Sequence, residues 1–270
     1  MKYYLSNPLA NNGIEPKAKD GIVLTNCKDM DFPKFFDGLK KDDEVVLVGG
    51  DGTINRFAND MRGYDIKNNV YLLGNGTGND FLNDINRKTD EEVLLNDYLK
   101  NLPTVRVNGM ERVFLNDMGL GIDGYCCEEA DRIKAVHPSK KINYTAIAIK
   151  GLLFKFKPFH VDINVDGKDY SFDNAWLAPT MKGRFYGGGM MIAPDQDRKS
   201  GLLSVVVYSC KSKLKSLIAF PEIFEGKHVA RTDMVTVITG KKVHVKISRP
   251  CAAQIDGDTV LNVTEYDAWQ

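Results

Sequence analysis

Residues 45–57 read Val-Val-Leu-Val-Gly-Gly-Asp-Gly-Thr-Ile-Asn-Arg-Phe. The four apolar residues predict a buried strand, and the small residues that follow end it. One face of a helix comes next, with apolar residues at Ile54, Phe57, Ala58 and Met61. The order strand, glycine turn and helix is typical of an open α/β sheet, in which ligands bind at the carboxyl ends of the strands.

The glycine turn at residues 49–53 suits a phosphate. Gly49, Gly50 and Gly52 can adopt positive φ and let backbone N–H groups approach a ligand closely, next to the N-terminus of a helix. The turn lacks the Lys of a P-loop. Asp51 would repel a phosphate unless a cation lay between them, so it indicates Mg²⁺ or proton transfer. A helix cap is the structural alternative for Asp51.

A second glycine loop follows the next predicted strand, at residues 70–73. Residues 74–81 read Gly-Asn-Gly-Thr-Gly-Asn-Asp-Phe. Because neighbouring parallel strands end at the same edge of a sheet, we expect the two loops to face one crevice. Asn79 and Asp80 are either part of that site or caps of the following helix.

The composition excludes several classes of protein. With 43% hydrophobic and 27% charged residues, the chain is of the ordinary globular type. Its 36 basic and 36 acidic residues leave no net charge, which argues against a nucleic-acid binder. The five cysteines lack metal-ligand spacing, so reduced thiols in a cytoplasmic protein are expected. No run reaches the ~18 apolar residues of a transmembrane helix.

The pattern changes near residue 103. Asx-Gly turns at residues 108–109 and 166–167 separate short strands, which predicts an antiparallel β-sandwich. We therefore expect a three-layer α/β nucleotide-binding domain at residues 1–103 and a β-sandwich domain at residues 104–270. Helices are predicted at residues 89–102, 143–156 and 213–224. The last two have one apolar face and several lysines, which fits either a solvated face or docking on an anionic membrane.

The two loops resemble the signatures of the diacylglycerol kinase catalytic family, which has the sphingosine kinases and NAD kinases as distant relatives. The first signature is Gly-Gly-Asp-Gly-Thr at residues 49–53, and the second is Gly-Thr-x-Asn-Asp at residues 76–80. Asn7, Pro8 and Gly13 match a further loop that contributes to the family's ATP site. The resemblance implies that ATP is bound by Asn7, Gly49, Gly50, Asp51, Gly52, Thr53, Gly76 and Thr77.

The same resemblance implies Mg²⁺ and a substrate network. Mg²⁺ would join the ATP phosphates to Asp51 and Asp80, and Asn79, Asp80 and Asp123 would surround the substrate and the metal. Asp123 ends residues 114–123, which resemble the family's Phe-x-Asn-x-x-Gly-x-Gly-x-Asp segment. A β-bulge with structural polar residues is the alternative for this segment.

One segment of the second domain departs from the family. Residues 187–194 match its Gly-Gly-Gly-x-x-x-Ala-Pro stretch, but Ser200 stands where the family has an Asp that helps to bind a structural Mg²⁺. A hydroxyl is a poorer Mg²⁺ ligand than a carboxylate. We therefore expect this structural metal site to be weakened or absent, with Asp195 or Asp197 as partial substitutes.

The last signature lies at residues 256–258. The family typically has Asp-Gly-Glu there, with the Glu as proton acceptor for the substrate hydroxyl, and Asp258 takes the place of that Glu. The shorter side chain matters because a base must come within roughly 2.6–3.2 Å of its proton. Asp258 is thus the expected catalytic base, with Asp256 or Asp51 as alternatives. A structural turn between two strands is the other interpretation.

The sequence therefore predicts a cytoplasmic, ATP- and Mg²⁺-dependent lipid kinase that phosphorylates the hydroxyl of diacylglycerol or a similar lipid alcohol, reached at the inner face of a membrane. Two alternatives stay open. One is a catalytically impaired nucleotide- or lipid-binding protein, and the other is a soluble-substrate kinase related to NAD kinases. Residues 77–80 and 187–194 argue against the second. The oligomeric state is left open, a homodimer included, and no nucleic-acid partner is expected.

Overall fold

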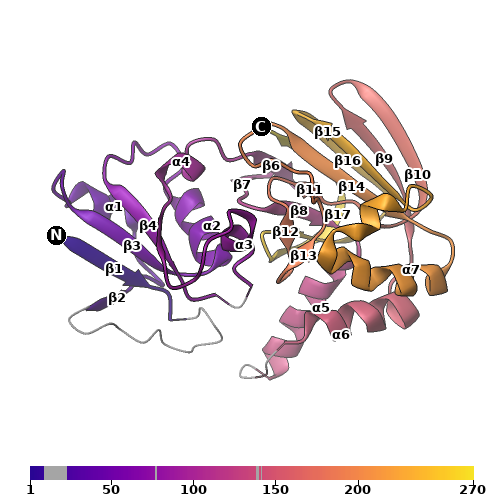
Figure 1. Cartoon of the computed structure of the whole chain (residues 1–270), viewed down its shortest axis with the longest axis horizontal. Helices are drawn as coiled ribbons and strands as arrows, with labels where there is room; N and C mark the ends of the chain where they lie inside the picture. The colour runs from indigo at the N-terminus through magenta and orange to yellow at the C-terminus, as the bar shows by residue number, and fades with distance from the viewer. Residues whose placement is uncertain (9–22, 77, 138–139, 141) are drawn as a thin grey trace. The chain divides into compact units, whose positions relative to one another are not determined.

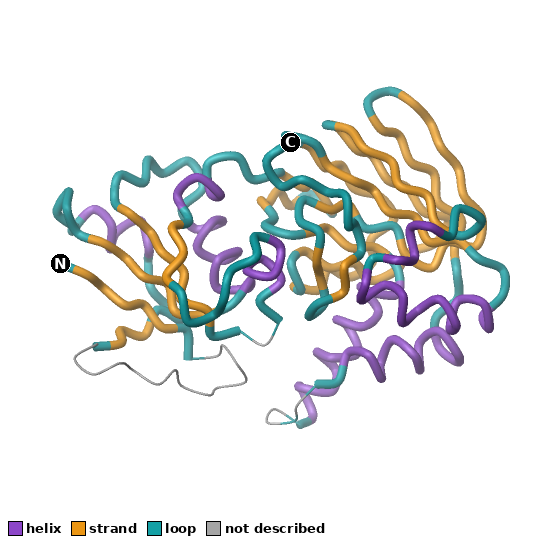
Figure 2. Tube along the Cα trace, in the orientation of Figure 1, coloured by secondary structure: helices purple, strands orange, loops and turns teal. Residues whose placement is uncertain are grey.

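A computed structural model describes residues 1–8, 23–76, 78–137, 140 and 142–270. The chain divides into two compact units, Met1–Leu102 and Pro103–Gln270 (Figure 1). The first is a sheet with helices, and the second is rich in strands (Figure 2). The predicted fold class is thereby confirmed. In the described part of the chain, no helix is long and apolar enough to cross a membrane.

The first unit is built on a sheet with the strand order β2-β1-β3-β4-β5. Its strands are β1 (Lys2–Ser6), β2 (Leu24–Asn26), β3 (Glu44–Gly49), β4 (Asn69–Gly74) and β5 (Glu92–Leu94). Its helices are α1 (Phe32–Asp37), α2 (Asp51–Asp60), α3 (Asp80–Asp84) and α4 (Asn96–Leu99). The apolar run that predicts β3 forms the centre of the core: Val45, Val46, Leu47 and Val48 are buried. Phe57 of α2 packs edge-on against Phe32 of α1.

The helix predicted at residues 89–102 is wrong. The structure has the short strand β5 there, followed by the single turn α4. β5 pairs antiparallel with β4 and places Val93 opposite Leu72. Pairing with β4 satisfies backbone groups at the edge of the sheet, a tertiary effect that overrides the helical spacing of the apolar residues.

In the second unit, the described residues form a ten-stranded sheet with the order β7-β6-β17-β16-β8-β11-β14-β10-β9, and β15 pairs with β14. Its strands are β6 (Thr104–Val107), β7 (Met110–Val113), β8 (Asp117–Leu120), β9 (Phe159–Val165), β10 (Lys168–Leu177), β11 (Thr180–Met181), β14 (Leu203–Ser209), β15 (Val235–Gly240), β16 (Lys242–Ile255) and β17 (Asp258–Trp269). β12 (Phe185–Tyr186) and β13 (Met190–Met191) form a separate hairpin around the predicted triple-glycine loop.

The long strand β16 folds this sheet over on itself. Its first part pairs with β9 and its last part with β8, so the sheet closes around a buried core. The register with β17 shifts between Lys246 and Cys251, where the chain carries Pro250. A Pro lacks the N–H of a regular ladder and is tolerated at such an irregularity. The sheet-rich second domain predicted from the short strands is confirmed.

Tight turns of one kind connect three of the strand pairs. Asn108-Gly109, Asp166-Gly167 and Asp256-Gly257 each have positive φ at both residues. This is the conformation of a type I′ turn, which matches the twist of a two-residue hairpin. The first two hairpins are as predicted, and the third corresponds to the structural alternative for the last signature.

The second unit also contains helical segments. They are α5 (Ile122–Val136), α6 (Tyr144–Lys150), the π-helix η2 (Gly151–Lys155), α7 (Lys213–Ala219) and the 3₁₀ segments η3 (Phe220–Glu225) and η4 (Lys227–Ala230). The helices predicted at residues 143–156 and 213–224 are present. The first continues from α6 into the wider π-helix η2, and the second continues from α7 into the tighter 3₁₀ segment η3. The long helix α5 was not predicted, because Gly119 and Gly121 before it indicate a loop or bulge.

Helix α5 lies unusually close to strand β16. A Cβ atom on Gly124 would come within 2.1 Å of the carbonyl oxygen of Ala252, a backbone atom that cannot move independently. Gly124 is therefore a packing requirement of the second unit.

We expect Gly124→Ala to destabilise the second unit by about 1–3 kcal/mol or more, because the added methyl group forces the helix away from the sheet. Trp176 and Trp269 are the only tryptophans of the chain and both lie in this unit, so urea unfolding followed by their fluorescence measures it. Glu128→Ala, at an exposed position of the same helix, serves as control and should change stability by less than about 0.5 kcal/mol. Equal stability of the two variants would contradict the packing argument.

Candidate functional site

The two glycine loops of the first unit lie at one edge of its sheet, as predicted. β3 and β4 are parallel neighbours, with Gly49 opposite Gly74. The N–H of Asn75 donates to the carbonyl of Gly49 (2.7 Å), and a Cβ atom on Gly50 would lie 2.6 Å from the Cα of Gly76. The prediction that these glycines are needed for positive φ is wrong, however. None of Gly49, Gly50 and Gly52 has positive φ, and close contact between the loop backbones is what excludes a side chain at Gly50.

Asp51 ties the first loop to the helix that follows the second. Its two carboxylate oxygens accept hydrogen bonds from the N–H groups of Asp80 and Phe81, each at 2.8 Å. A carboxylate at this position satisfies unpaired N–H groups and interacts favourably with the positive end of α3. Asp51 therefore acts as a cap, but of α3 and not of the helix α2 that it begins.

Asn79 does not cap α3 with its side chain, although it occupies the N-cap position. It has φ of 51°, and its amide group bonds back to Gly76 instead, accepting from the N–H (3.1 Å) and donating to the carbonyl (2.8 Å). This contact shapes the second loop around Gly76. The side chain of Asp80 is buried at the start of the helix.

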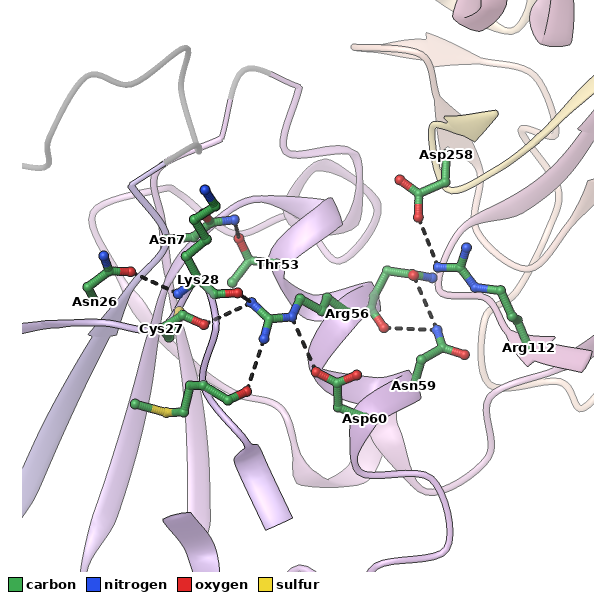
Figure 3. Close-up of polar contacts among 12 residues, drawn as sticks. Asn7, Asn26, Cys27, Lys28, Thr53, Arg56, Asn59, Asp60, Arg112 and Asp258 are labelled. Carbon is green, nitrogen blue, oxygen red and sulfur yellow. Dashed lines mark hydrogen bonds and ion pairs between the residues drawn. The ribbon is translucent and has the colours of Figure 1, made fainter. Parts of the chain in front are cut away.

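The end of β1 joins the same edge. Asn7 donates through Nδ2 to Oγ1 of the buried Thr53, at 3.3 Å (Figure 3). In the first turn of α2, a Cβ atom on Gly52 would meet no atom within 4 Å, so there is open space next to the positive end of this helix. Thr77, a predicted ATP-binding residue, and Gly13, which matches a loop of the family's ATP site, lie outside the described residues.

Arg56 was not predicted as a site residue. It nevertheless holds the chain segment that follows β2, the strand that pairs with β1 on the side away from β3. Its guanidinium donates to the carbonyls of Cys27 (2.8 Å), Met30 (3.0 Å) and Lys28, and pairs with Asp60 (3.2 Å; Figure 3). The segment after β2 is thereby held against α2. Nothing in the local sequence signals this role, because the acceptors are backbone carbonyls about 28 residues earlier in the chain.

In the second unit, the last signature contains two carboxylates: that of Asp256 accepts backbone hydrogen bonds, and that of Asp258 is exposed. Asp256 accepts hydrogen bonds from the N–H groups of Asn116 (2.7 Å) and Asp117 (3.0 Å), and a further one from Leu115. Asp258 begins β17 with a side chain that is 63% exposed, and it forms an ion pair with Arg112 (2.9 Å; Figure 3). Asp256 is thus engaged in holding the backbone, whereas Asp258 is open to a ligand.

Asp123 is buried and only half satisfied. Its Oδ1 accepts the N–H of Gly124 (2.9 Å), and among the described residues its Oδ2 has no hydrogen-bond partner. Burial raises the pKa of Asp123 to about 6. A Cβ atom on Gly119 would lie 2.2 Å from Oδ2 of Asp123 and 2.3 Å from Nε2 of Gln254. Gly119 therefore makes room for a polar cluster with an acceptor available for a hydroxyl group.

The segment around Ser200 is the one at which a weakened or absent structural Mg²⁺ site is predicted. The Ser200 hydroxyl donates to the carbonyl of Asp197 (2.7 Å), and the side chains of Asp195 and Asp197 are exposed. The cation at this segment is the buried guanidinium of Arg198, which donates to Asn116 Oδ1 (2.7 Å) and to the carbonyl of Leu115. In the described part of the chain, no three His, Cys, Asp or Glu side chains are grouped to hold a metal ion.

Comparison with known proteins identifies both units. Residues 18–107 match the diacylglycerol kinase catalytic domain, and residues 116–265 match the YegS C-terminal NAD kinase β-sandwich-like domain. A diacylglycerol kinase of Mycobacterium tuberculosis is 28% identical over 264 residues, which cover 90% of this chain and 84% of that protein. The crystal structure of a diacylglycerol kinase from Bacillus anthracis superposes with a TM-score of 0.65 at 19% identity, covering 100% of this chain and 94% of that one, and supports the fold.

The two family models match successive parts of the chain, in the order in which the sequence motifs occur, and the second model alone covers more than half of it. The resemblance inferred from the motifs is thereby confirmed. The chain belongs to the diacylglycerol kinase catalytic-domain family, a family of kinases, and carries that family's β-sandwich-like second domain.

Proposed function

We propose that this protein is an ATP- and Mg²⁺-dependent lipid kinase that phosphorylates the hydroxyl group of diacylglycerol or a similar lipid alcohol at a membrane surface. Family membership supports the class of reaction. The observation that carries the proposal is the joining of the two glycine loops at one sheet edge by Asp51. Two such loops, held in contact beside the positive end of α2, form a preorganised place for a chain of phosphates.

The nucleotide is assigned to the first unit. Asn7, Thr53 and the backbone of both loops would bind the phosphates, with Thr77 as a further proposed contact. The open space at Gly52 is where a phosphate could approach the N-terminus of α2 without a steric clash. Because backbone N–H groups point outward at a helix start, this arrangement binds phosphate without a Lys.

Asp51 and Asp80 are the residues that would hold Mg²⁺. Each oxygen of the Asp51 carboxylate accepts a backbone N–H of α3, which fixes the position of the carboxylate at the sheet edge. Two carboxylates are few for a metal cage, but Mg²⁺ commonly takes only one or two from the protein and the rest from phosphates and water. When bound, Mg²⁺ would neutralise charge on the transferring phosphates.

The proton acceptor is assigned to the second unit. The proposed base is Asp258, which would take the proton of the lipid hydroxyl while the hydroxyl oxygen attacks the γ-phosphorus and ADP leaves. Arg112 would orient the Asp258 carboxylate through their ion pair. The unpartnered Oδ2 of Asp123 would accept a hydrogen bond from the substrate and position it.

The proposal is tested by ATP-dependent phosphorylation of diacylglycerol, a sphingoid base and NAD in mixed micelles, with and without Mg²⁺. We expect transfer to a lipid, dependent on Mg²⁺, and a loss of kcat of at least about 100-fold in Asp258→Asn, the usual scale for a proton acceptor. Asp51→Ala should also lose turnover, because it removes a proposed Mg²⁺ ligand. Asp258→Glu should retain most activity. Transfer to NAD alone would assign a soluble substrate, and ATP binding with no transfer would indicate a binding protein.

The nucleotide site is tested with a matched pair of glycines. Gly52→Ala should leave the stability of the free protein unchanged or slightly raised, since its Cβ meets no atom and Ala favours a helix. It should weaken ATP binding at least tenfold in calorimetric titration, because the methyl group would occupy the space assigned to a phosphate. Gly38→Ala, exposed at the end of α1, is the control and should bind ATP like the wild type. Equal affinities would place the nucleotide elsewhere.

Asp123 makes stability depend on pH. Because its folded pKa of about 6 lies above the unfolded value near 3.8, the folded chain holds more protons in between, and stability falls as pH rises from 4 to 6. Asp123→Asn removes this loss. We expect the variant to unfold like the wild type at pH 4 and to be more stable by up to about 3 kcal/mol at pH 7.

Tryptophan fluorescence in urea measures this difference in the second unit. Lipid phosphorylation by Asp123→Asn should fall even as its stability rises. A variant that gained stability with full activity would show that the unpartnered carboxylate is not used by the substrate.

A further inference from the structure

Large apolar side chains are exposed on two helical segments of the second unit. On α6 and η2, Ile149 is 38% and Phe154 74% exposed, and on α7 Leu214 is 68% and Ile218 61% exposed. Leu214 and Ile218 are four residues apart and so share one face of α7. Each segment also buries part of its surface in the core, through Leu152 and Ala219 respectively. The exposed residues are therefore a second apolar surface, in addition to the face that packs inward.

The two segments are neighbours. Nζ of Lys213, at the start of α7, donates to the carbonyl of Leu153 in η2 at 3.0 Å. Figure 1 shows α7 beside the pink helical segment that begins with α6. Their exposed apolar side chains consequently belong to one region of the second unit, which we call the α6–α7 surface.

Lysines accompany these apolar residues, and acidic residues are missing from both segments. The lysines are Lys150, Lys155, Lys157, Lys211, Lys213 and Lys215. No Asp or Glu occurs from residue 132 to 161 or from 198 to 221. The neighbouring helix α5 carries Glu128, Glu129 and Asp131, of which Glu129 is paired with Arg132. Asp173 and Asp233 line a pocket together with Lys211 and Lys215, so the lysines outnumber the acidic residues near the two segments. The α6–α7 surface is thus apolar and positively charged together.

We propose that the α6–α7 surface docks on the anionic surface of a lipid bilayer, with Phe154, Leu214 and Ile218 entering the interface and the lysines contacting acidic headgroups. This inference rests on the proposed function, because it places the protein at the membrane that holds a lipid substrate. Exposed aromatic and aliphatic side chains flanked by lysines are what an interfacial helix needs. A second copy of the chain is disfavoured as the occupant, since it would bring two sets of six lysines together.

The experiment is co-sedimentation with vesicles in the absence of nucleotide. The probes are vesicles of phosphatidylcholine alone and of phosphatidylcholine with 30% phosphatidylglycerol. We expect wild-type binding to the anionic vesicles only, weakened at least tenfold between 0.1 and 0.5 M salt. Phe154→Ser with Leu214→Ser should weaken binding at least tenfold, and Lys150→Gln with Lys155→Gln should weaken it and reduce the salt dependence.

The control is Leu261→Ser, which removes an apolar side chain of similar exposure from β17. Thermal unfolding and ATP binding are measured on every variant, so that loss of folding or of the kinase site is recognised separately from loss of docking. Kinase activity in detergent micelles without vesicle binding would overturn the docking proposal and leave the proposed function standing. Equal vesicle binding by the wild type and Phe154→Ser/Leu214→Ser would also overturn it, as would a dimer that these substitutions dissociate.

Discussion

Two backbone N–H groups at the start of α3 are satisfied by the carboxylate of Asp51, which belongs to the other glycine loop. The arrangement of the whole sheet edge depends on this contact. It requires β3 and β4 to be parallel neighbours in register, and it holds the loops so close that Gly50 and Gly76 leave no space for a side chain. A charged group used in this way stabilises the helix start and also places negative charge beside the proposed phosphate site.

In the second unit, one carboxylate also accepts backbone N–H groups, whereas another carboxylate is buried without a full set of partners. Asp256 holds the backbone of residues 115–117 with its carboxylate, and Arg198 holds the same segment from a different element with its guanidinium. Asp123, a few residues further on, is buried with an oxygen that no described residue satisfies. Buried polar groups are normally paired, so this unpartnered oxygen is the observation on which the proposed substrate contact of Asp123 rests.

A kinase that acts on lipids must serve two environments. Phosphates require backbone N–H groups, which the two glycine loops and the start of α2 bring to one sheet edge of the first unit. A lipid must be reached from a bilayer, and the second unit exposes apolar side chains among lysines on α6, η2 and α7. The chain as a whole has no net charge, so the positive charge of this region comes from the uneven distribution of lysines along the chain.

Local patterns in the sequence were sufficient for the fold class, for β3 and for the Asx-Gly hairpins, because each depends on residues adjacent in the chain. They also located both glycine loops. The tertiary structure alone decided the strand β5, which exists through pairing with β4, and the cap of α3 by Asp51. It also decided the hydrogen bond from the N–H of Asn116 to the carboxylate of Asp256. These contacts join residues 29 and 140 positions apart, and no local periodicity or propensity reports which distant backbone groups will need a partner.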